Sequence, residues 1–372
     1  MTGFHVSVPD LRGFGGQVGE LGTGYTALGK GIGDKYTSAL ETADVKNQII
    51  GGVGVLAPAL VALQDQCDAL MGAHISACKV MSESLEATDE RLVGAANDYE
   101  GKDLEAEAEL RKADPSEGAE ATADAITRGS ANESWGTDYN VDDYLTEDLA
   151  GTVIPEMAFK PTLESAKQAL DKAGGGWFSK VEAVVEYFCG FSPSEEIVKP
   201  LIGDWGVLWY VADLHQGAAK AVNELSNVMY SGADALLGEY WAGDAADDFC
   251  QWILANWWRE LHKHGALFDR SAARLNEIAH KLQADGQKIA DGLLSVADIA
   301  LDIALALRGA GKKGPVNPVS LVKDLGEAGY ALGESLGTLG LSLYRASNTT
   351  LAELTSDLAK LNPPLNLKHY QQ

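Results

Sequence analysis

Two glycine-rich segments come close to known nucleotide-binding patterns. Residues 24–31 read GYTALGKG, but Gly31 replaces the hydroxyl residue with which a GxxxxGK[ST] loop holds magnesium. Residues 52–57 read GVGVLA, like a dinucleotide-binding turn, but residues 46–50 make a poor central strand before it. Because neither segment has a strand–turn–helix context, we predict no nucleotide site at either. A flexible hairpin turn explains the second segment.

The histidines and acids form no recognisable catalytic or metal-binding pattern. His262 and His264 are two residues apart, so on a helix they point to different faces, and no HExxH spacing surrounds them. No GxSxG nucleophile motif is present, and an acid pair such as Asp247–Asp248 is typical of a solvated surface. We therefore predict a protein that is not an enzyme, with no catalytic residue, no cofactor and no metal.

The four cysteines also lack ligand spacing. Cys67, Cys78, Cys189 and Cys250 form no CxxC pair. Cys67 and Cys78 would lie three helical turns apart, about 16 Å, which is too far for a disulfide. We expect buried apolar side chains.

Composition excludes further classes. The 372 residues carry 54 acids against 29 Lys and Arg, a net charge of −25, which repels nucleic acid. Apolar residues make up 46% of the chain, and proline is scarce, which favours folded helices. The first thirty residues resemble no signal peptide, and the apolar tract 292–307 is interrupted by Asp298 and Asp302. No secretory leader and no membrane span are expected.

The first third of the chain predicts a helical hairpin. Pro9 and Asp10 suit a helix start, and a second helix is expected from Pro58 to Ala113 after a turn at 51–54. Both helices carry one apolar face. The residues on these two faces are Leu11, Phe14, Val18, Leu21, Tyr25, Leu28, Ile32, and then Leu60, Leu63, Cys67, Leu70, His74, Met81, Leu85, Leu92 and Tyr99.

The remainder predicts an acidic linker followed by more helices. Residues 98–148 hold sixteen acids and four cations, and we expect partial order around Trp135, Tyr139 and Tyr144. Helices are predicted at 161–173, 177–189 and 192–237, then a long one from 244 to 307, a breaker at 308–318 and weaker helices over 319–361. The expected fold is all-α: antiparallel hairpins packed as an elongated four-helix bundle, with a C-terminal helical extension. The predicted units are 1–113, 114–155, 156–310 and 311–372.

The segment 240–249, YWAGDAADDF, is the most informative one. Gly243 permits a tight turn, while Asp244 and Asp247 meet the unpaired N–H groups of the next helix. Trp241, on a loop, either closes the end of the bundle or stays partly open for a partner.

These residues resemble a known family. Trp241, Gly243 and the following DAA and Phe249 look like the Trp-x-Gly hairpin of type VII (ESX) secretion substrates. Residues 1–113, with the opening GFHV and the later YEGKD, resemble the PE or EspC-like partner hairpin. Both hairpins in one chain look like the EspB-like arrangement, a PE–PPE-like fusion. The likeness spans about 1–113 and 195–290.

The resemblance implies an export signal made of Trp241, Gly243, Tyr99 and Asp103. Tyr99 and Asp103 match the Tyr-x-x-x-Asp/Glu signal and share a helix face that we expect to be solvated. Five further tyrosines have the same spacing, and Tyr99 is preferred for its place at the end of the apolar face. The others are Tyr139, Tyr144, Tyr230, Tyr240 and Tyr330.

The expected function is that of a non-enzymatic structural or virulence-type factor. The resemblance implies that the protein is secreted, or held at the cell surface, through a type VII system without a cleavable signal. It also implies a secretion ATPase or chaperone as partner, with a homo-oligomer as one possible fate. One alternative is a membrane-active or toxin-type effector acting through residues 290–361, although Glu327, Glu334 and Asp302 disfavour membrane contact. Another is a cytoplasmic helical scaffold.

Overall fold

The computed structural model describes most of the 372 residues. The described residues are 5–43, 56–113, 126–127, 129–152, 155, 157–174, 186, 192, 205–307, 318–361 and 363. The expected turn at 51–54, the helix at 177–189 except residue 186, most of the helix start after Ser192, and residues 308–317 of the expected breaker lie outside them.

Helices dominate the described part of the chain, and the fold is all-α as predicted. The α-helices are α1 (Val8–Thr42), α3 (Ala57–Ala113), α5 (Phe159–Gly174), α8 (Val207–Ala235), α9 (Asp244–Trp252), α10 (Arg259–Leu307), α11 (Pro318–Arg345) and α12 (Ala352–Leu358). Short helical turns are η1 (Val141–Asp143), η2 (Leu149–Gly151), η4 (Leu236–Tyr240), η5 (Ile253–Trp258) and η6 (Ala346–Leu351). The strands are β1 (His5–Ser7), β2 (Ile126–Thr127) and β3 (Trp241–Ala242).

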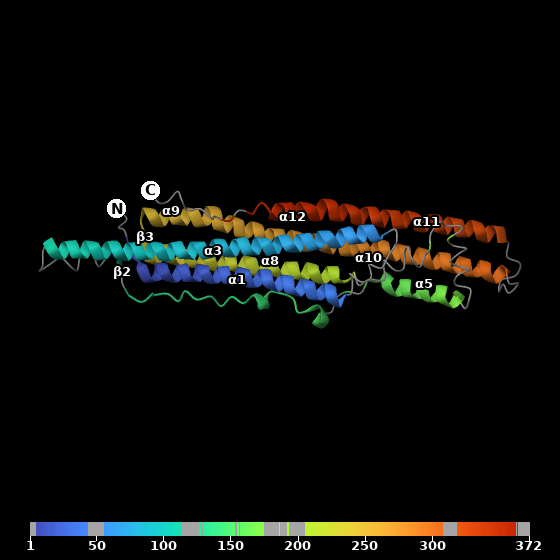
Figure 1. The fold of residues 1–372 in the computed structure, drawn as a ribbon, viewed down its shortest axis with the longest axis horizontal. Helices are drawn as coiled ribbons and strands as arrows, with labels where there is room; N and C mark the ends of the chain where they lie inside the picture. The colour runs from blue at the N-terminus through green and yellow to red at the C-terminus, as the bar shows by residue number, and fades with distance from the viewer. Residues whose placement is uncertain are drawn as a thin grey trace.

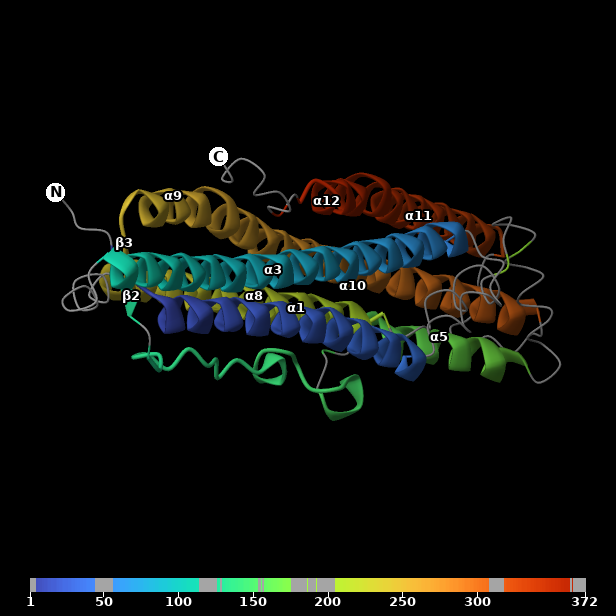
Figure 2. The same ribbon diagram turned by 60° about the vertical axis from the view of Figure 1, so that its left-hand side comes forward.

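The helices α1 and α3 form the predicted hairpin. They run antiparallel along the long axis of the molecule (Figures 1 and 2) and pack closely on each other. Every residue of the predicted apolar faces is buried except Tyr99, which is half-buried. Cys67 and Cys78 are buried free thiols, as expected, and burial raises the pKa of Cys67 to about 12. Burial of these two faces against each other is the main force holding the hairpin together.

A second pair, α8 and α10, completes a four-helix section. α8 packs on α10, and α1 packs on α8, so the two hairpins share one core. With 57 residues, α3 is about 85 Å long at 1.5 Å per residue, which gives the molecule its elongated shape (Figure 1).

The second half of α10 is covered by other helices. α5 and α11 pack on it, and η6 and α12 return along α10 to reach α3 (Figure 1). None of the helices in the described part is both long and apolar enough to cross a membrane. The boundaries of the four predicted units remain a prediction.

The described residues also contain one small sheet that the sequence pattern did not indicate. β1 pairs in parallel with β2 and antiparallel with β3, which makes a three-stranded sheet at one end of the bundle (Figures 1 and 2). Val6 lies opposite both Ile126 and Trp241 in this sheet. The strands have only two or three residues each, which is too short for an alternating pattern to be visible in the sequence.

Residues 129–152 lie along the bundle and pack into notches left by glycines. An added Cβ at Gly13 would come within 2.0 Å of the Trp135 ring, and one at Gly217 within 2.2 Å of the Tyr144 carbonyl oxygen. Trp135 is buried and Tyr144 is half-buried, so the partial order expected here is confirmed. Some of the recurring glycines of α1 therefore give room for close packing, which offsets their low helix propensity.

Two neighbouring glycines on α1 give a direct test of these notches. Gly13→Ala should lower the free energy of unfolding by about 1–3 kcal/mol, because the new methyl group overlaps the Trp135 ring. Gly16→Ala meets no atom within 4 Å and should raise stability by about 0.5–1 kcal/mol through helix propensity. Urea unfolding measures both. Equal effects of the two substitutions would contradict the packing of Trp135 on Gly13.

Candidate functional site

The Trp-x-Gly turn is held by a short strand and by one glycine. Trp241 and Ala242 pair with Val6 and His5 of β1, which fixes the backbone at this position. Gly243 follows with φ 117°, a conformation that side-chain-bearing residues rarely adopt. The carbonyl of Gly243 accepts the first helical hydrogen bond of α9, from the Asp247 N–H at 3.0 Å. The turn therefore requires glycine at this position.

Trp241 is buried, with 6% of its surface exposed. It lies in β3 and not on an open loop, so of the two expected roles the structure favours closing the end of the bundle. Its ring lies 5.3 Å from the ring of Phe249 and 6.4 Å, edge to face, from that of Tyr99. Such aromatic contacts stabilise by about 0.5–1.5 kcal/mol each beyond the burial of area.

A groove of about 250 Å³ opens beside Trp241, between α3 and α9. Its walls are mainly apolar and aromatic, with Arg91 and Asp248 as the charged members. The lining residues are Thr88, Arg91, Leu92, Ala95, Tyr99, Trp241, Ala245, Asp248, Phe249 and Trp252. We call this feature the Trp241 groove.

Tyr99 lies in the wall of the Trp241 groove, while Asp103 does not line it. Burial raises the pKa of Tyr99, and the neighbouring Trp241 side chain partly offsets this rise, so the phenol stays neutral at ordinary pH. Asp103 is one turn further along α3 and is buried, with 5% of its surface exposed. The expectation that this face of α3 is solvated is therefore wrong at Asp103. The end of α3 projects beyond the neighbouring helices (Figure 1).

A chain of aromatic contacts continues from the groove into the bundle. The Phe249 ring contacts Phe14 of α1 at 6.2 Å, and Phe14 contacts Trp135 at 5.8 Å. The Trp135 ring in turn contacts Tyr240, the residue before Trp241, at 6.3 Å. Residues from α1, α9, η4 and the 129–152 segment thus meet at one end of the molecule.

The buried carboxylate of Asp10 connects the start of α1 to the 129–152 segment at this end of the molecule. Its oxygens accept hydrogen bonds from the Ser7 hydroxyl at 2.5 Å, the Trp135 indole N–H at 3.1 Å and the Asn132 backbone N–H at 2.9 Å. A fully buried carboxylate is tolerated only with such donors. The sequence suggested only a helix-dipole role for Asp10, because its partners Asn132 and Trp135 lie more than 120 residues away.

The make-up of the Trp241 groove is suited to binding. The Trp241 groove combines several aromatic walls with a few polar groups, which is the usual make-up of a recognition site. Among the described residues, no group of three or more His, Cys, Asp or Glu could hold a metal ion. Comparison with family models, curated proteins and solved structures gives no match to this chain.

Sequence reasoning identified two of the groove residues as site residues and missed the others. Leu92, Ala95 and Tyr99 follow helical spacing on α3, and Phe249 and Trp252 do so on α9. These periodic patterns were visible in the sequence, but only the packing of α3 beside α9 shows that they face the same space.

The turn geometry predicts a difference between two nearby glycines. Gly243→Ala should lower the free energy of unfolding by about 1–3 kcal/mol, because alanine is strained at φ 117°. Gly238→Ala, where an added Cβ meets nothing within 4 Å, should change stability by less than about 1 kcal/mol. Thermal or urea unfolding separates them. A neutral Gly243→Ala would show that the turn adopts another conformation.

Proposed function

We propose that this chain is a non-enzymatic substrate of a type VII secretion system. The observation that supports this proposal most is the contact between Trp241 and Tyr99 at one end of the bundle, where the centres of the two rings lie 6.4 Å apart. The two residues are separated by more than 140 positions and belong to different hairpins. A composite signal of Trp241, Gly243, Tyr99 and Asp103 needs such a meeting.

The burial of the residues suggests how each one acts in this proposal. Trp241 and Gly243 shape the turn, and Trp241 forms part of the groove wall. Half-buried Tyr99 presents one edge in the groove, where a secretion ATPase or chaperone could contact it. Asp103 supports the end of α3 from a buried position. In this proposal the partner recognises the Trp241 groove as a whole and not the isolated tryptophan side chain.

The test uses a substitution that fills the groove and leaves the core intact. Ala245 lines the groove and is exposed, so Ala245→Gln adds bulk there at little cost in stability. Ala273→Gln places the same side chain at an exposed site of α10 that does not line the groove. We expect the secreted fraction of Ala245→Gln to fall at least fivefold, while Ala273→Gln is exported like the wild type.

Secretion is measured in the culture supernatant of cells with an active type VII system and of matched cells lacking its ATPase. Equal unfolding temperatures for the two variants exclude a folding defect as the cause. Export that does not depend on the ATPase would contradict the proposal. No export of the wild type would also contradict it and would favour the cytoplasmic scaffold. Unchanged export of Ala245→Gln would remove the groove from the signal.

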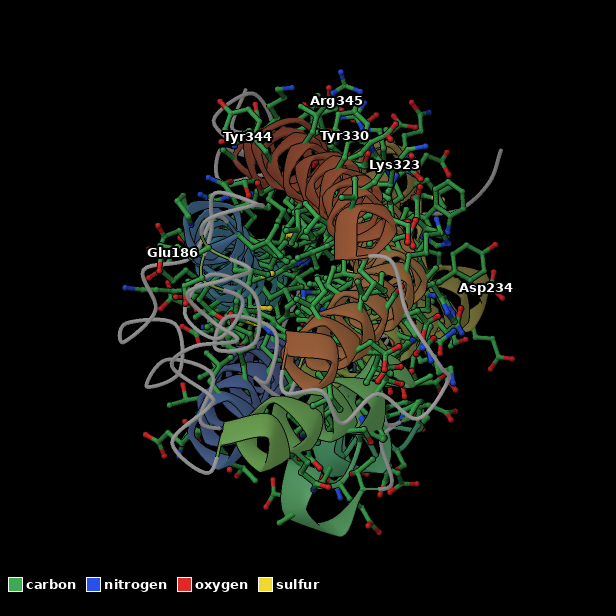
Figure 3. The ribbon with its side chains drawn as sticks, turned by 90° about the vertical axis from the view of Figure 1, so that its right-hand side faces the viewer. Glu186, Asp234, Lys323, Tyr330, Tyr344 and Arg345 are labelled. Atoms are coloured by element: carbon green, nitrogen blue, oxygen red, sulfur yellow. The ribbon has the colours of Figure 1, made fainter. Side chains whose placement is uncertain are left out.

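A membrane-active role is the second candidate, supported by large apolar and aromatic side chains that are exposed on α11. Tyr330 is 77% exposed, Leu341 51% and Tyr344 57%, and Figure 3 shows both tyrosines on the outer surface of this helix. Exposed aromatic groups of this kind can bind at a membrane interface.

Vesicle leakage tests this candidate. If the proposal of an export substrate is right, the protein should release no trapped dye from neutral vesicles at pH 7. Leakage that is lost in Tyr330→Ser and kept in Ala273→Gln would instead assign membrane activity to α11.

A further inference from the structure

Three histidines meet in the core of the four-helix section, and none of them lines the Trp241 groove. His74 comes from α3, His215 from α8 and His264 from α10, and none has more than 2% of its surface exposed. The His74 ring lies 5.1 Å from that of His215 and 5.8 Å from that of His264. Tyr25 of α1 stacks on His264 at 5.9 Å. We call these four side chains the histidine layer, to which each helix of the section contributes one member.

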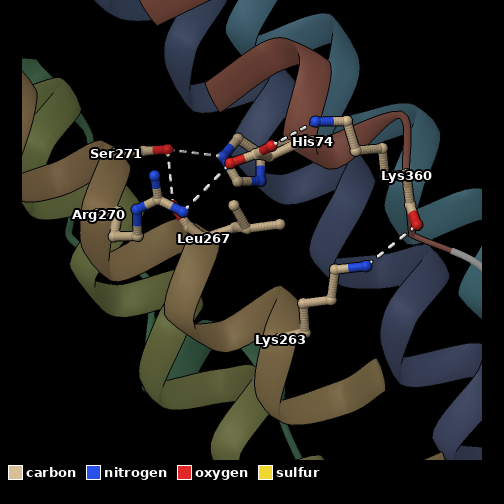
Figure 4. A network of polar contacts seen from close by, with 7 residues as sticks. His74, Lys263, Leu267, Arg270, Ser271 and Lys360 are labelled. Carbon is tan, nitrogen blue, oxygen red and sulfur yellow. Dashed lines mark hydrogen bonds and ion pairs between the residues drawn. The ribbon is translucent and has the colours of Figure 1, made fainter. Parts of the chain in front are cut away.

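Two of the three rings each donate one hydrogen bond, which places one N–H on each of those rings. The Ser271 hydroxyl donates to the Leu267 carbonyl at 2.8 Å, so it accepts the Nε2–H of His74 at 3.0 Å (Figure 4). The Nδ1–H of His215 donates to the Val211 carbonyl at 2.7 Å. In the neutral form the second nitrogen of each ring carries a lone pair, and this nitrogen has no hydrogen-bond partner in the described part of the chain.

Several polar atoms of the layer have no hydrogen-bond partner in the described part of the chain. They are His74 Nδ1, His215 Nε2, both ring nitrogens of His264 and the Tyr25 hydroxyl. Phe268 stacks on His74 at 3.9 Å and on His264 at 4.8 Å, so the surroundings are aromatic. A proton added to any of these rings would create a charge in an apolar core, with no carboxylate hydrogen-bonded to it in the described structure.

Among the described residues, the other ionisable groups near the layer offer no compensation. Glu260, which is buried one turn before His264 on α10, forms ion pairs with Arg259 and Lys263. Cys78 of α3 and Tyr139 lie close to Tyr25, and burial raises the pKa values of all three groups, so they stay uncharged. On the α12 side, Arg270 and Lys360 are both paired with Asp357 (Figure 4).

We propose that the histidine layer is an acid-sensitive latch between the two hairpins, closed at neutral pH and released by protonation. Closed, it lets α1 and α3 pack against α8 and α10. Opening would expose the three imidazoles to water, where each binds a proton at mildly acidic pH. Acid therefore favours the opened bundle by mass action.

The direction of the pKa shifts agrees with this geometry. Burial, together with the other two histidines, lowers the pKa of His74 well below its usual value. Burial lowers the pKa of His215 to about 4 and that of His264 to about 3. The folded bundle binds fewer protons than the opened chain. The stability that the neutral histidines contribute is therefore complete above about pH 6.5, and it is lost as the pH falls toward the pKa values of the folded state.

Linkage gives the size of the effect. With a pKa of about 6.5 in the opened chain, each histidine that stays neutral when folded raises the opening constant about 25-fold between pH 7 and pH 5. Replacing one of these histidines by an apolar residue of similar size removes its contribution of about 25-fold to the change in the opening constant. His264→Leu is the best choice, because neither of its ring nitrogens has a hydrogen-bond partner in the described part.

The experiment compares unfolding constants from urea titrations at pH 7 and pH 5 for the full chain. For each protein we take the ratio of the unfolding constant at pH 5 to that at pH 7. This ratio should be about 25-fold smaller for His264→Leu than for the wild type, and His215→Leu should behave alike. His280→Gln, at an exposed position of α10, should keep the wild-type ratio. Carboxylates titrate equally in all these proteins, so their contribution cancels.

A second measurement needs no variant to fold. In the NMR spectrum of the wild-type protein, the ring protons of His74, His215 and His264 should show no titration above pH 5 while the bundle is folded. Titration near pH 6.5 at these residues would overturn the proposal. A wild-type pH response in both leucine variants would overturn it as well.

Discussion

The alignment of the two hairpins along the bundle axis determines which residues meet at the end of the bundle that carries Trp241. Helices with continuous apolar faces can slide by one turn and still bury most of their surface, because the faces repeat along their length. The pairing of Val6 with Trp241 prevents such a slip, since the short sheet joins the start of α1 to the turn before α9. The hydrogen bonds of Asp10 strengthen the same joint. Only in this alignment does Tyr99 of α3 reach Trp241.

The helices and their buried faces were predictable from the sequence because their signal is local and repeated. The apolar positions of α1, from Leu11 to Ile32, recur at steps of three and four, and all are buried. The turn at Gly243 was also predictable, because a glycine followed by acids at a helix start has a local physical meaning. His262 and His264 do face different environments, since His264 is fully buried while His262 is not.

The contacts that assemble the site were not predictable, because their partners are far apart in the sequence. Asp10 resembles any acid at a helix start until Trp135 is placed beside it. His74 fits the apolar face of α3 like any other position, and nothing local links it to His215 or His264. The burial of Asp103 likewise depends on tertiary structure. Residue types and spacing gave candidate residues, whereas their chemical surroundings needed the fold.

The wide separation of the two paired hairpins has a consequence for the order in which the protein is made. The ribosome completes α1 and α3 long before it reaches α8 and α10, which supply the other half of the shared core. About 190 residues separate the end of α3 from the end of α10, which at roughly 5–20 residues per second takes about 10–40 s. During that interval the apolar faces of the first hairpin toward α8 and α10 are open to water. The chain therefore spends part of its synthesis with half of its shared core uncovered.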